Sequence, residues 1–309
     1  MPVTQEVHID RAMTEFSLRY SNSLFIAESV IPPAFVQKDS DKWFKYDKSN
    51  MRSESDGPRG DREAAEEASY SVTTDSYQLG YYSLKDIVTD RVRNNSDAPL
   101  RPDEDAVQNL LDKMLLGKEI RAAALMFSTS NITQNTTLSG TSRWSDYSGS
   151  DPFGDIETAR AQVLSGSTRL PNAVVMGWQV WSKLKYHTGL VERIKYSTPN
   201  GMTLAMFADL IEIEVGNIFI GAAQKDTAVE GQTYSASFVW GKGFNLFYRN
   251  PNPSPSSLAC ALTLRKQQDR EVTTWRSNDP AGDYKKVEMT YVQKLVEEKA
   301  AYYIASAVA

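Results

Sequence analysis

The chain has 309 residues, of which 41% are hydrophobic and 24% are charged. This composition is ordinary for globular proteins and excludes both wholesale disorder and a fibrous repeat, and the length suggests about two domains. A formal net charge of −5 argues against a protein that holds nucleic acid by neutralising phosphates, so we expect no sequence-specific DNA binding.

The sequence offers neither a secretory signal nor a membrane span. Met1, Pro2 and Val3 lead directly into polar residues, and the most apolar tail, residues 300–309, is about half as long as a membrane helix needs. The single cysteine, Cys260, cannot close an intrachain disulfide, and its apolar neighbours predict a buried side chain. We therefore expect a reducing compartment and no membrane association.

The first 40 residues carry short apolar runs followed by the pair Pro32-Pro33, which forbids a helix there and favours extended chain. This pattern is typical of an N-terminal arm. An ordinary N-terminal strand is the alternative.

Residues 42–48 are rich in aromatic and charged side chains, and residues 70–84 alternate as strands do, so the two segments predict a hairpin. Residues 51–68 between them combine turn formers with three arginines and six acids, which cannot build a core. Such a charged run is usually a solvated loop, but its length exceeds what a simple hairpin needs.

Residues 103–127 predict a long helix. Three acids, Asp103, Glu104 and Asp105, stand in its first turn, where they meet the positive end of the helix dipole. Leucine and methionine recur on one broad face, which Lys118 and Arg121 interrupt, while Glu119 is expected outside it. An apolar stripe at this spacing indicates core and no cofactor.

Residues 128–155 are rich in Ser, Thr, Asn and Gly, and uninterrupted loops of this length tend to be functional or disordered. The pattern then becomes mixed α and β. It predicts helices over residues 156–164, 178–187 and 204–210, a short buried strand over 173–176 and a long strand over 211–223.

The remaining sequence predicts a hairpin over residues 237–248 with Gly241, Lys242 and Gly243 at its turn. Prolines at 251, 253 and 255 exclude regular structure before a strand over residues 258–264. Two more strands are predicted over 271–276 and 287–292, and a strand or a helix over 297–305.

No catalytic or metal-binding motif emerges. The two histidines, His8 and His187, are far apart in sequence, and no GxSxG frame marks a serine nucleophile. We interpret His187 as a helix C-terminal residue, where cationic character is favoured. The Gly241-Lys242-Gly243 run lacks the upstream glycine and the following Ser or Thr of a phosphate loop. The sequence therefore predicts no enzyme, no cofactor and no metal.

Several short motifs follow one another along nearly the whole chain. The motifs are Ile26-Ala27-Glu28-Ser29-Val30-Ile31-Pro32, Lys42-Trp43-Phe44-Lys45-Tyr46-Asp47, Tyr82-Ser83-Leu84-Lys85, Leu138-Ser139-Gly140, Trp144-Ser145-Asp146, Asp151-Pro152, Pro171-Asn172-Ala173-Val174-Val175-Met176-Gly177 and Val239-Trp240-Gly241. Each is weak alone, but their order and spacing together are specific, and they resemble the major capsid proteins of tailed double-stranded DNA bacteriophages.

The resemblance implies an α+β fold that these capsids share with encapsulins. It would comprise an N-terminal arm (1–40), an extended β-hairpin loop (41–86), a peripheral domain (87–155) with a spine helix (103–127) and an axial domain (156–264). Residues 265–309 would be C-terminal strands that return to the peripheral or the axial domain.

By the same resemblance, the chain would self-assemble into hexamers and pentamers of an icosahedral shell around phage DNA. Because the sequence enters its arm almost at once from Met1, a separate scaffolding protein is implied, together with a portal and a possible decoration protein. The shell would be assembled in the bacterial cytoplasm and become part of the virion.

We predict that the hairpin contacts a neighbouring subunit, because its tip is too polar for a core and too long for a tight turn. An encapsulin-like compartment is the alternative within the fold, and an α/β enzyme is a disfavoured one. The candidate contact residues are Trp43, Tyr46, Arg52, Glu54, Asp56, Arg59, Asp61, Arg62 and Glu63.

Overall fold

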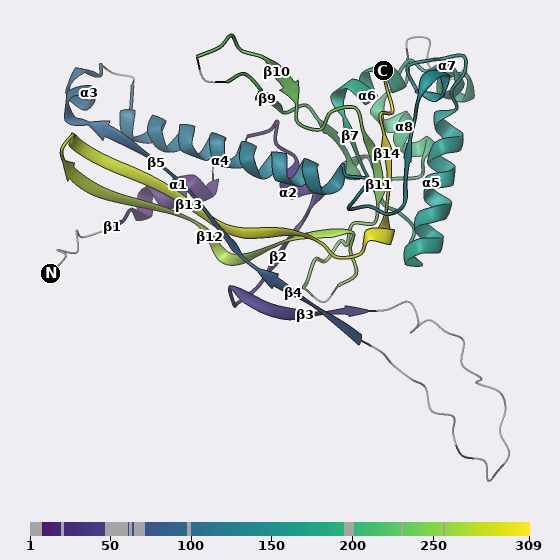
Figure 1. The fold of residues 1–309 in the computed structure, drawn as a ribbon, viewed down its shortest axis with the longest axis horizontal. Coiled ribbons are helices and arrows are strands. Elements are labelled where there is room, and N and C mark those ends of the chain that lie inside the picture. Colours follow the sequence, from purple (N-terminus) through teal and green to yellow (C-terminus); the bar gives the residue numbers. More distant parts are fainter. Residues whose placement is uncertain are drawn as a thin grey trace.

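A computed structural model of the chain describes residues 8–19, 22–46, 61, 64, 72–97, 100–194, 201–229, 231–255 and 257–309. The described strands form two sheets of five strands and two separate two-stranded ribbons (Figure 1). The helices are α1 (Arg11–Arg19), α2 (Ala27–Val30), α3 (Asp90–Asn95), α4 (Pro102–Met126), α5 (Pro152–Ser167), α6 (Trp178–Leu184), α7 (Thr188–Val191) and α8 (Leu204–Leu210), with short 3-10 turns η2 (Gly140–Ser142), η3 (Glu192–Ile194), η4 (Val215–Asn217) and η5 (Glu298–Ala300).

Each strand belongs to one of these sheets or ribbons. They are β1 (His8–Ile9), β2 (Pro33–Phe35), β3 (Ser40–Tyr46), β4 (Val72–Gln78), β5 (Gly80–Thr89), β6 (Asn135–Thr137), β7 (Ala173–Gly177), β8 (Ile218–Gly221), β9 (Gln224–Asp226), β10 (Ala236–Phe238), β11 (Phe244–Phe247), β12 (Ala261–Asn278), β13 (Ala281–Leu295) and β14 (Ala301–Ala305).

The first sheet, here called sheet 1, has the order β1-β12-β13-β5, with β2 added in parallel to β12. Helix α4 runs along it (Figure 1). Val107, Leu111 and Met114 of the helix pack on Val287 and Met289 of β13. Pro102 occupies the first turn, where its missing N–H costs nothing, and three acids follow it. The predicted long helix is confirmed.

The second sheet, here called sheet 2, has the order β6-β14-β11-β7-β8 and is buried on both faces. All five residues of β7 are buried, and successive side chains point to opposite faces. One face, with Val174 and Met176, packs on α5, α6 and α8. The other, with Val175, packs on the end of α4 and on the arm around Ala27. Sheet 2 therefore has two cores.

Three predicted helices and one predicted strand of this region are confirmed. Helix α5 covers residues 156–164, α6 begins at Trp178, α8 has the predicted bounds, and β7 contains residues 173–176. Cys260 is fully buried, as predicted, and burial raises the pKa of its thiol.

The predicted strand over residues 211–223 is wrong in its first half. Glu212 has a φ of +55°, the turn η4 follows, and only β8 is extended. The alternation of Glu212 and Glu214 with apolar residues reflects a turn in which Ile211 and Ile213 reach the core while both acids stay exposed. Period two is a weak signal over so few residues.

The predicted hairpin over residues 237–248 is also wrong. Strand β10 pairs with β9 in a separate ribbon, whereas β11 enters sheet 2 between β14 and β7. Gly241 with φ +51° turns the chain between two sheets and not within one. Local sequence cannot distinguish these cases, because both partners of β11 lie more than 50 residues away.

Residues 128–155 form an ordered segment, against the expectation of a functional or disordered loop. Strand β6 pairs in parallel with β14, and the fully buried Trp144 donates from Nε1 to Asp155 at 2.8 Å. The backbone N–H of Trp144 donates to the carbonyl of Ala307 at 2.7 Å. The segment is therefore hydrogen-bonded to β14 and to Ala307 near the C-terminus.

Within the first 40 residues, the described segments 8–19 and 22–40 contribute β1 and β2 to sheet 1, and the residues around Ala27 pack against sheet 2. Residues 33–35 are extended as the prolines predict, but α1 and α2 were not predicted. At the other end, β12 runs unbroken through two predicted strands, with a bulge between Arg265 and Arg270. Residues 301–305 form a strand, which settles the strand-or-helix alternative. In the described parts of the chain, none of the helices combines the length and the hydropathy needed to cross a membrane.

Candidate assembly interface

His187 and Ser150 form a serine–histidine contact. The Nε2 atom of the buried His187 lies 2.9 Å from Ser150 Oγ, and Nδ1 accepts a hydrogen bond from the N–H of Gly189 at 3.2 Å. The ring proton therefore sits on Nε2 and is donated to Ser150. Because burial lowers the pKa of His187, the ring is neutral. An imidazole that donates to the serine cannot take up its proton.

This geometry corrects the interpretation of His187 as a cationic residue at a helix C-terminus. Its side chain caps the N-terminus of α7 and is completely buried. Among the residues that the structure describes, no three His, Cys, Asp or Glu side chains converge as a metal ion would require.

The hairpin β3–β4 projects away from both sheets (Figure 1). Its strands pair in register from Ser40 opposite Gln78 to Tyr46 opposite Val72, as the sequence predicts. At its root, Trp43 and Tyr77 are buried against Leu262 and Leu264 of β12. The ammonium of Lys294 lies 2.9 Å from Asp75. The root is thus fixed to sheet 1 by an apolar cluster and an ion pair.

The structure places three of the candidate contact residues. Trp43 packs within its own chain, Tyr46 ends the β3 ladder, and Asp61 is exposed. The others lie outside the described residues, so their contact with a neighbour stays a prediction; they are Arg52, Glu54, Asp56, Arg59, Arg62 and Glu63.

Strand β5 is an edge of sheet 1, and a groove of about 400 Å³ separates this edge from α4. Tyr81 and Leu84 are 61% and 41% exposed along it. Lys113 and Arg121 line the groove, and its described lining contains no carboxylate. An open strand edge with exposed apolar side chains is a surface that native proteins normally cover.

The arm is held on α4 by two adjacent and oppositely charged residues, Lys118 and Glu119. The ammonium of Lys118 lies 2.6 Å from Glu28, which also lies 3.2 Å from Arg270 of β12. Burial opposes the ionisation of Glu28, but the cations outweigh it and lower the pKa of Glu28 from 4.5 to about 2. The arm therefore carries a persistent negative charge at this point.

Glu119 is fully buried and accepts three N–H groups. The backbone N–H groups of Ile26 and Ala27 donate to its two carboxylate oxygens at 3.1 and 2.8 Å, and Trp240 donates from Nε1 at 2.5 Å. Burial raises the pKa of Glu119, and the three donors oppose this rise. One carboxylate thereby joins α4, the arm and the segment between β10 and β11.

The burial of Glu119 contradicts the expectation that it lies outside the apolar face. Glu119 follows Leu115 by four residues and precedes Met126 by seven, so helical spacing brings it beside the stripe. The helical projection that placed Glu119 outside the face is therefore wrong, although glutamate is rarely buried without partners. The spacing was a usable signal, whereas the donors come from residues about 90 and 120 positions away.

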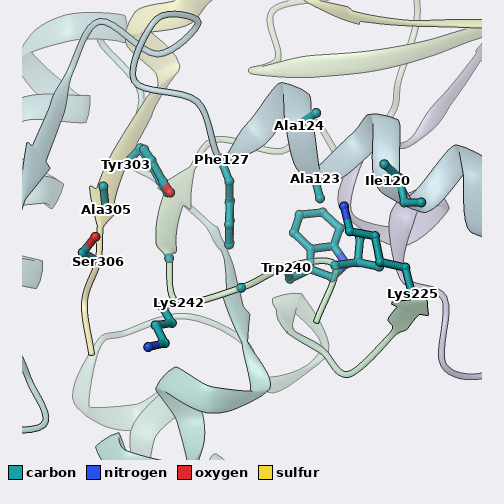
Figure 2. Close-up of a pocket in the computed structure, with 13 residues that line it drawn as sticks. Ile120, Ala123, Ala124, Phe127, Lys225, Trp240, Lys242, Tyr303, Ala305 and Ser306 are labelled. Carbon is teal, nitrogen blue, oxygen red and sulfur yellow. The ribbon is translucent and has the colours of Figure 1, made fainter. Parts of the chain in front are cut away.

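A second groove, of about 390 Å³, lies beside Trp240 where α4 meets sheet 2 (Figure 2). Phe127 stacks on Tyr303 with centroids 5.2 Å apart and meets Trp240 edge to face at the same separation. Figure 2 shows Lys225 and Lys242 extending on either side of this aromatic group. The junction between helix and sheet is therefore aromatic, with an open side.

Comparison with known proteins gives this geometry a context. Residues 80–239 match the model of a family described as phage major capsid protein E. The major capsid protein of Burkholderia phage BcepMu is 27% identical over 282 residues, which cover 86% of each chain.

Two solved structures share the fold. A phage-related protein from Bordetella bronchiseptica RB50 superposes with a TM-score of 0.76 at 24% identity, over 98% of this chain and 99% of the other. The mature capsid of bacteriophage PhiM1 gives a TM-score of 0.54 at 11% identity, over 93% and 87% of the two chains. The predicted tailed-phage capsid fold is thus confirmed.

Proposed function

The chain belongs to the family of phage major capsid protein E and is a structural subunit of a capsid, and from this premise we propose that it assembles as hexamers and pentamers into an icosahedral shell around double-stranded phage DNA. The observation that carries the proposal is the match of residues 80–239, about half of the chain, to that family. A capsid subunit must keep a rigid body and offer surfaces to its neighbours. Both requirements have counterparts in this fold.

The division of labour we propose follows the two sheets. Sheet 1 and α4 would be the main part of the peripheral domain (87–155), and sheet 2 with α5, α6 and α8 the main part of the axial domain (156–264). Strand β6 belongs to the range 87–155 but lies in sheet 2, so residues 128–155 would join the two domains. Strands β12 and β13 lie in sheet 1 while β14 lies in sheet 2, so the C-terminal strands serve both. Residues 1–40 would be the arm and 41–86 the extended loop, whose last residues enter sheet 1 as β5.

We further propose that residues 51–68 contact a neighbouring subunit. The segment has six acids and three arginines, and the hairpin root that carries it is buried and ion-paired. The groove beside β5, with Lys113 and Arg121 and without a described carboxylate, has the complementary charge. Exposed ion pairs stabilise by only about 0–1 kcal/mol each, so a shell depends on the repetition of the contact.

The partners in this proposal are other copies of the chain, a separate scaffolding protein, a portal and a decoration protein. DNA would be enclosed without sequence-specific contacts, which the net charge of −5 favours. Assembly would take place in the host cytoplasm. The chain would have no catalytic role. The hydrogen bond that His187 donates to Ser150 supports this, because in a nucleophilic pair the serine donates to the histidine.

The proposal is tested by electron microscopy of particles formed by the full chain together with its scaffolding protein. Closed shells that package phage DNA are the expected result. Shells that retain a protein cargo and no DNA would favour the encapsulin-like alternative. A chain that stayed monomeric at high concentration with the scaffolding protein present would contradict the assembly role.

A further inference from the structure

The strongest unexplained feature is a polar joint inside an otherwise apolar cluster. The end of α4, the arm and sheet 2 meet through Ala123, Met126, Ala27 and Val175, with Trp240 buried among them. Apolar contacts are not directional, so they hold these elements together without fixing the angle between them. Hydrogen bonds weaken steeply when their geometry changes, and the carboxylate of Glu119 supplies three of them at this point.

Trp240 is itself fitted into sheet 2 by paired glycines. Gly177 of β7 lies opposite Gly221 of β8, and a Cβ atom on Gly221 would lie 2.1 Å from Trp240 Cδ1. A Cβ on Gly177 would lie 1.8 Å from the carbonyl oxygen of Gly241. The indole and the residue after it therefore lie directly against β8 and β7.

The other side of the joint is equally defined. Trp240 donates to Glu119 on α4, and the same carboxylate binds the arm backbone at Ile26 and Ala27. The groove of Figure 2 leaves space beside the indole, so packing on that side does not hold it. Two buried hydrogen bonds then join α4 to sheet 2: the one between Glu119 and Trp240, and one that Asn245 of β11 donates from Nδ2 to the carbonyl of Met126 at 2.7 Å. Of the two, only the bond to Glu119 also involves the arm.

We propose that Glu119 is a positioning residue for shell geometry: through Trp240 it fixes the angle between α4 and sheet 2 once the arm is docked. This inference rests on the proposed function, because only in a closed shell does an angle within the subunit appear as curvature. A small error in that angle repeats in every copy. Loss of the bond should therefore broaden the distribution of shell diameters.

The neighbouring residue Lys118 provides a matched control. Lys118 is also buried on α4 and also holds the arm, through Glu28, but its ion pair does not involve Trp240. Glu119→Leu keeps a side chain of similar size and removes both acceptor oxygens, and with them the contacts to Ile26, Ala27 and Trp240. Lys118→Met keeps most of the side-chain volume, and Glu28 retains Arg270 as a partner. Trp240→Phe removes the indole donor and keeps an aromatic ring.

The experiment measures shell diameters by electron microscopy and amide exchange in the subunit for each variant. Glu119→Leu and Trp240→Phe should broaden the diameters, whereas Lys118→Met should keep the wild-type distribution. Exchange should rise about tenfold or more around residues 24–30 and 239–243 in Glu119→Leu, and around 24–30 alone in Lys118→Met. The double variant Glu119→Leu/Trp240→Phe should be no broader than the broader single variant, because the bond between residues 119 and 240 is already absent from each single variant.

Unchanged diameters in Glu119→Leu, or equal broadening in Lys118→Met, would overturn the inference. If Glu119→Leu failed to fold, Trp240→Phe would decide, because in that variant the Glu119 carboxylate still binds the arm. If the wild-type chain formed no shells, the proposed function would fail. The exchange pattern would then still show whether Glu119 couples the arm to Trp240.

Discussion

The ammonium of Lys118 lies 2.6 Å from the carboxylate of Glu28, so a lysine side chain with 3% exposure on α4 holds the N-terminal arm. Arg270 of β12 binds the same carboxylate at 3.2 Å. A buried lysine is tolerated only with a fixed counter-charge, which makes the arm part of the folded body. The stability of the arm should consequently depend on pH.

Acid should weaken the fold through Glu28. Its pKa in the folded chain is about 2, below the ordinary value of 4.5, so its ion pairs stabilise the fold fully above about pH 4.5. That stabilisation is lost as the pH falls from about 4.5 to about 2. We expect Glu28→Gln to lower the urea midpoint at pH 7. The difference in midpoint between the variant and the wild type should shrink as the pH falls from about 4.5 to about 2. A difference that stayed constant down to pH 2 would show that Glu28 does not cause the pH dependence of stability.

The apolar face of α4 should contribute to the stability of the single subunit. Leu111 is fully buried between α4 and sheet 1, so Leu111→Ala should lower the free energy of unfolding by about 2–5 kcal/mol. Lys113 on the same helix is exposed, and Lys113→Ala should change it by less than about 0.5 kcal/mol. Denaturant unfolding measures both. Equal midpoints for the two variants would mean that this face is not core.

The close approach of β7 to Gly241 predicts a strong effect of one methyl group. Gly177→Ala would place a Cβ atom 1.8 Å from the Gly241 carbonyl oxygen, and we expect a loss of about 1–3 kcal/mol or more. A Cβ on Gly216 would meet nothing within 4 Å, so Gly216→Ala is the matched control. Thermal unfolding distinguishes them. A Gly177→Ala chain as stable as the control would be incompatible with this packing.

The charged hairpin segment should matter for assembly and not for folding. Replacing residues 53–65 with an Asn-Gly turn removes charges and leaves the buried root around Trp43 and Tyr77 intact. We expect an unchanged unfolding midpoint and no shells. Assembly of the wild-type chain should weaken with salt, because charges are screened beyond about 8 Å at physiological ionic strength.

Light scattering at low and high salt provides the measurement. Lys42→Ala is a suitable control, since Lys42 is an exposed charge on the described part of the same hairpin. If the shortened variant formed normal shells at both salt concentrations, residues 51–68 would be a solvated loop and the proposed contact would be wrong.

The sequence by itself determined those elements whose signal is local. The helical period of Leu111 and Leu115 and the three acids of the first turn define α4, because a helix forms all its backbone hydrogen bonds within about four residues. The hairpin β3–β4 was equally predictable, since its strands are consecutive and its polar segment could only lie outside the core. The ordered series of short motifs indicated the capsid fold.

Tertiary structure alone decided where β11 and Glu119 lie. Strand β11 pairs with β7 and β14, and Glu119 receives donors from the arm and from Trp240. In both cases the partners come from distant parts of the chain, so neither hydrophobic period nor residue type near the position identifies them. A buried carboxylate is stable only where N–H groups from several segments converge, and that convergence exists only after folding.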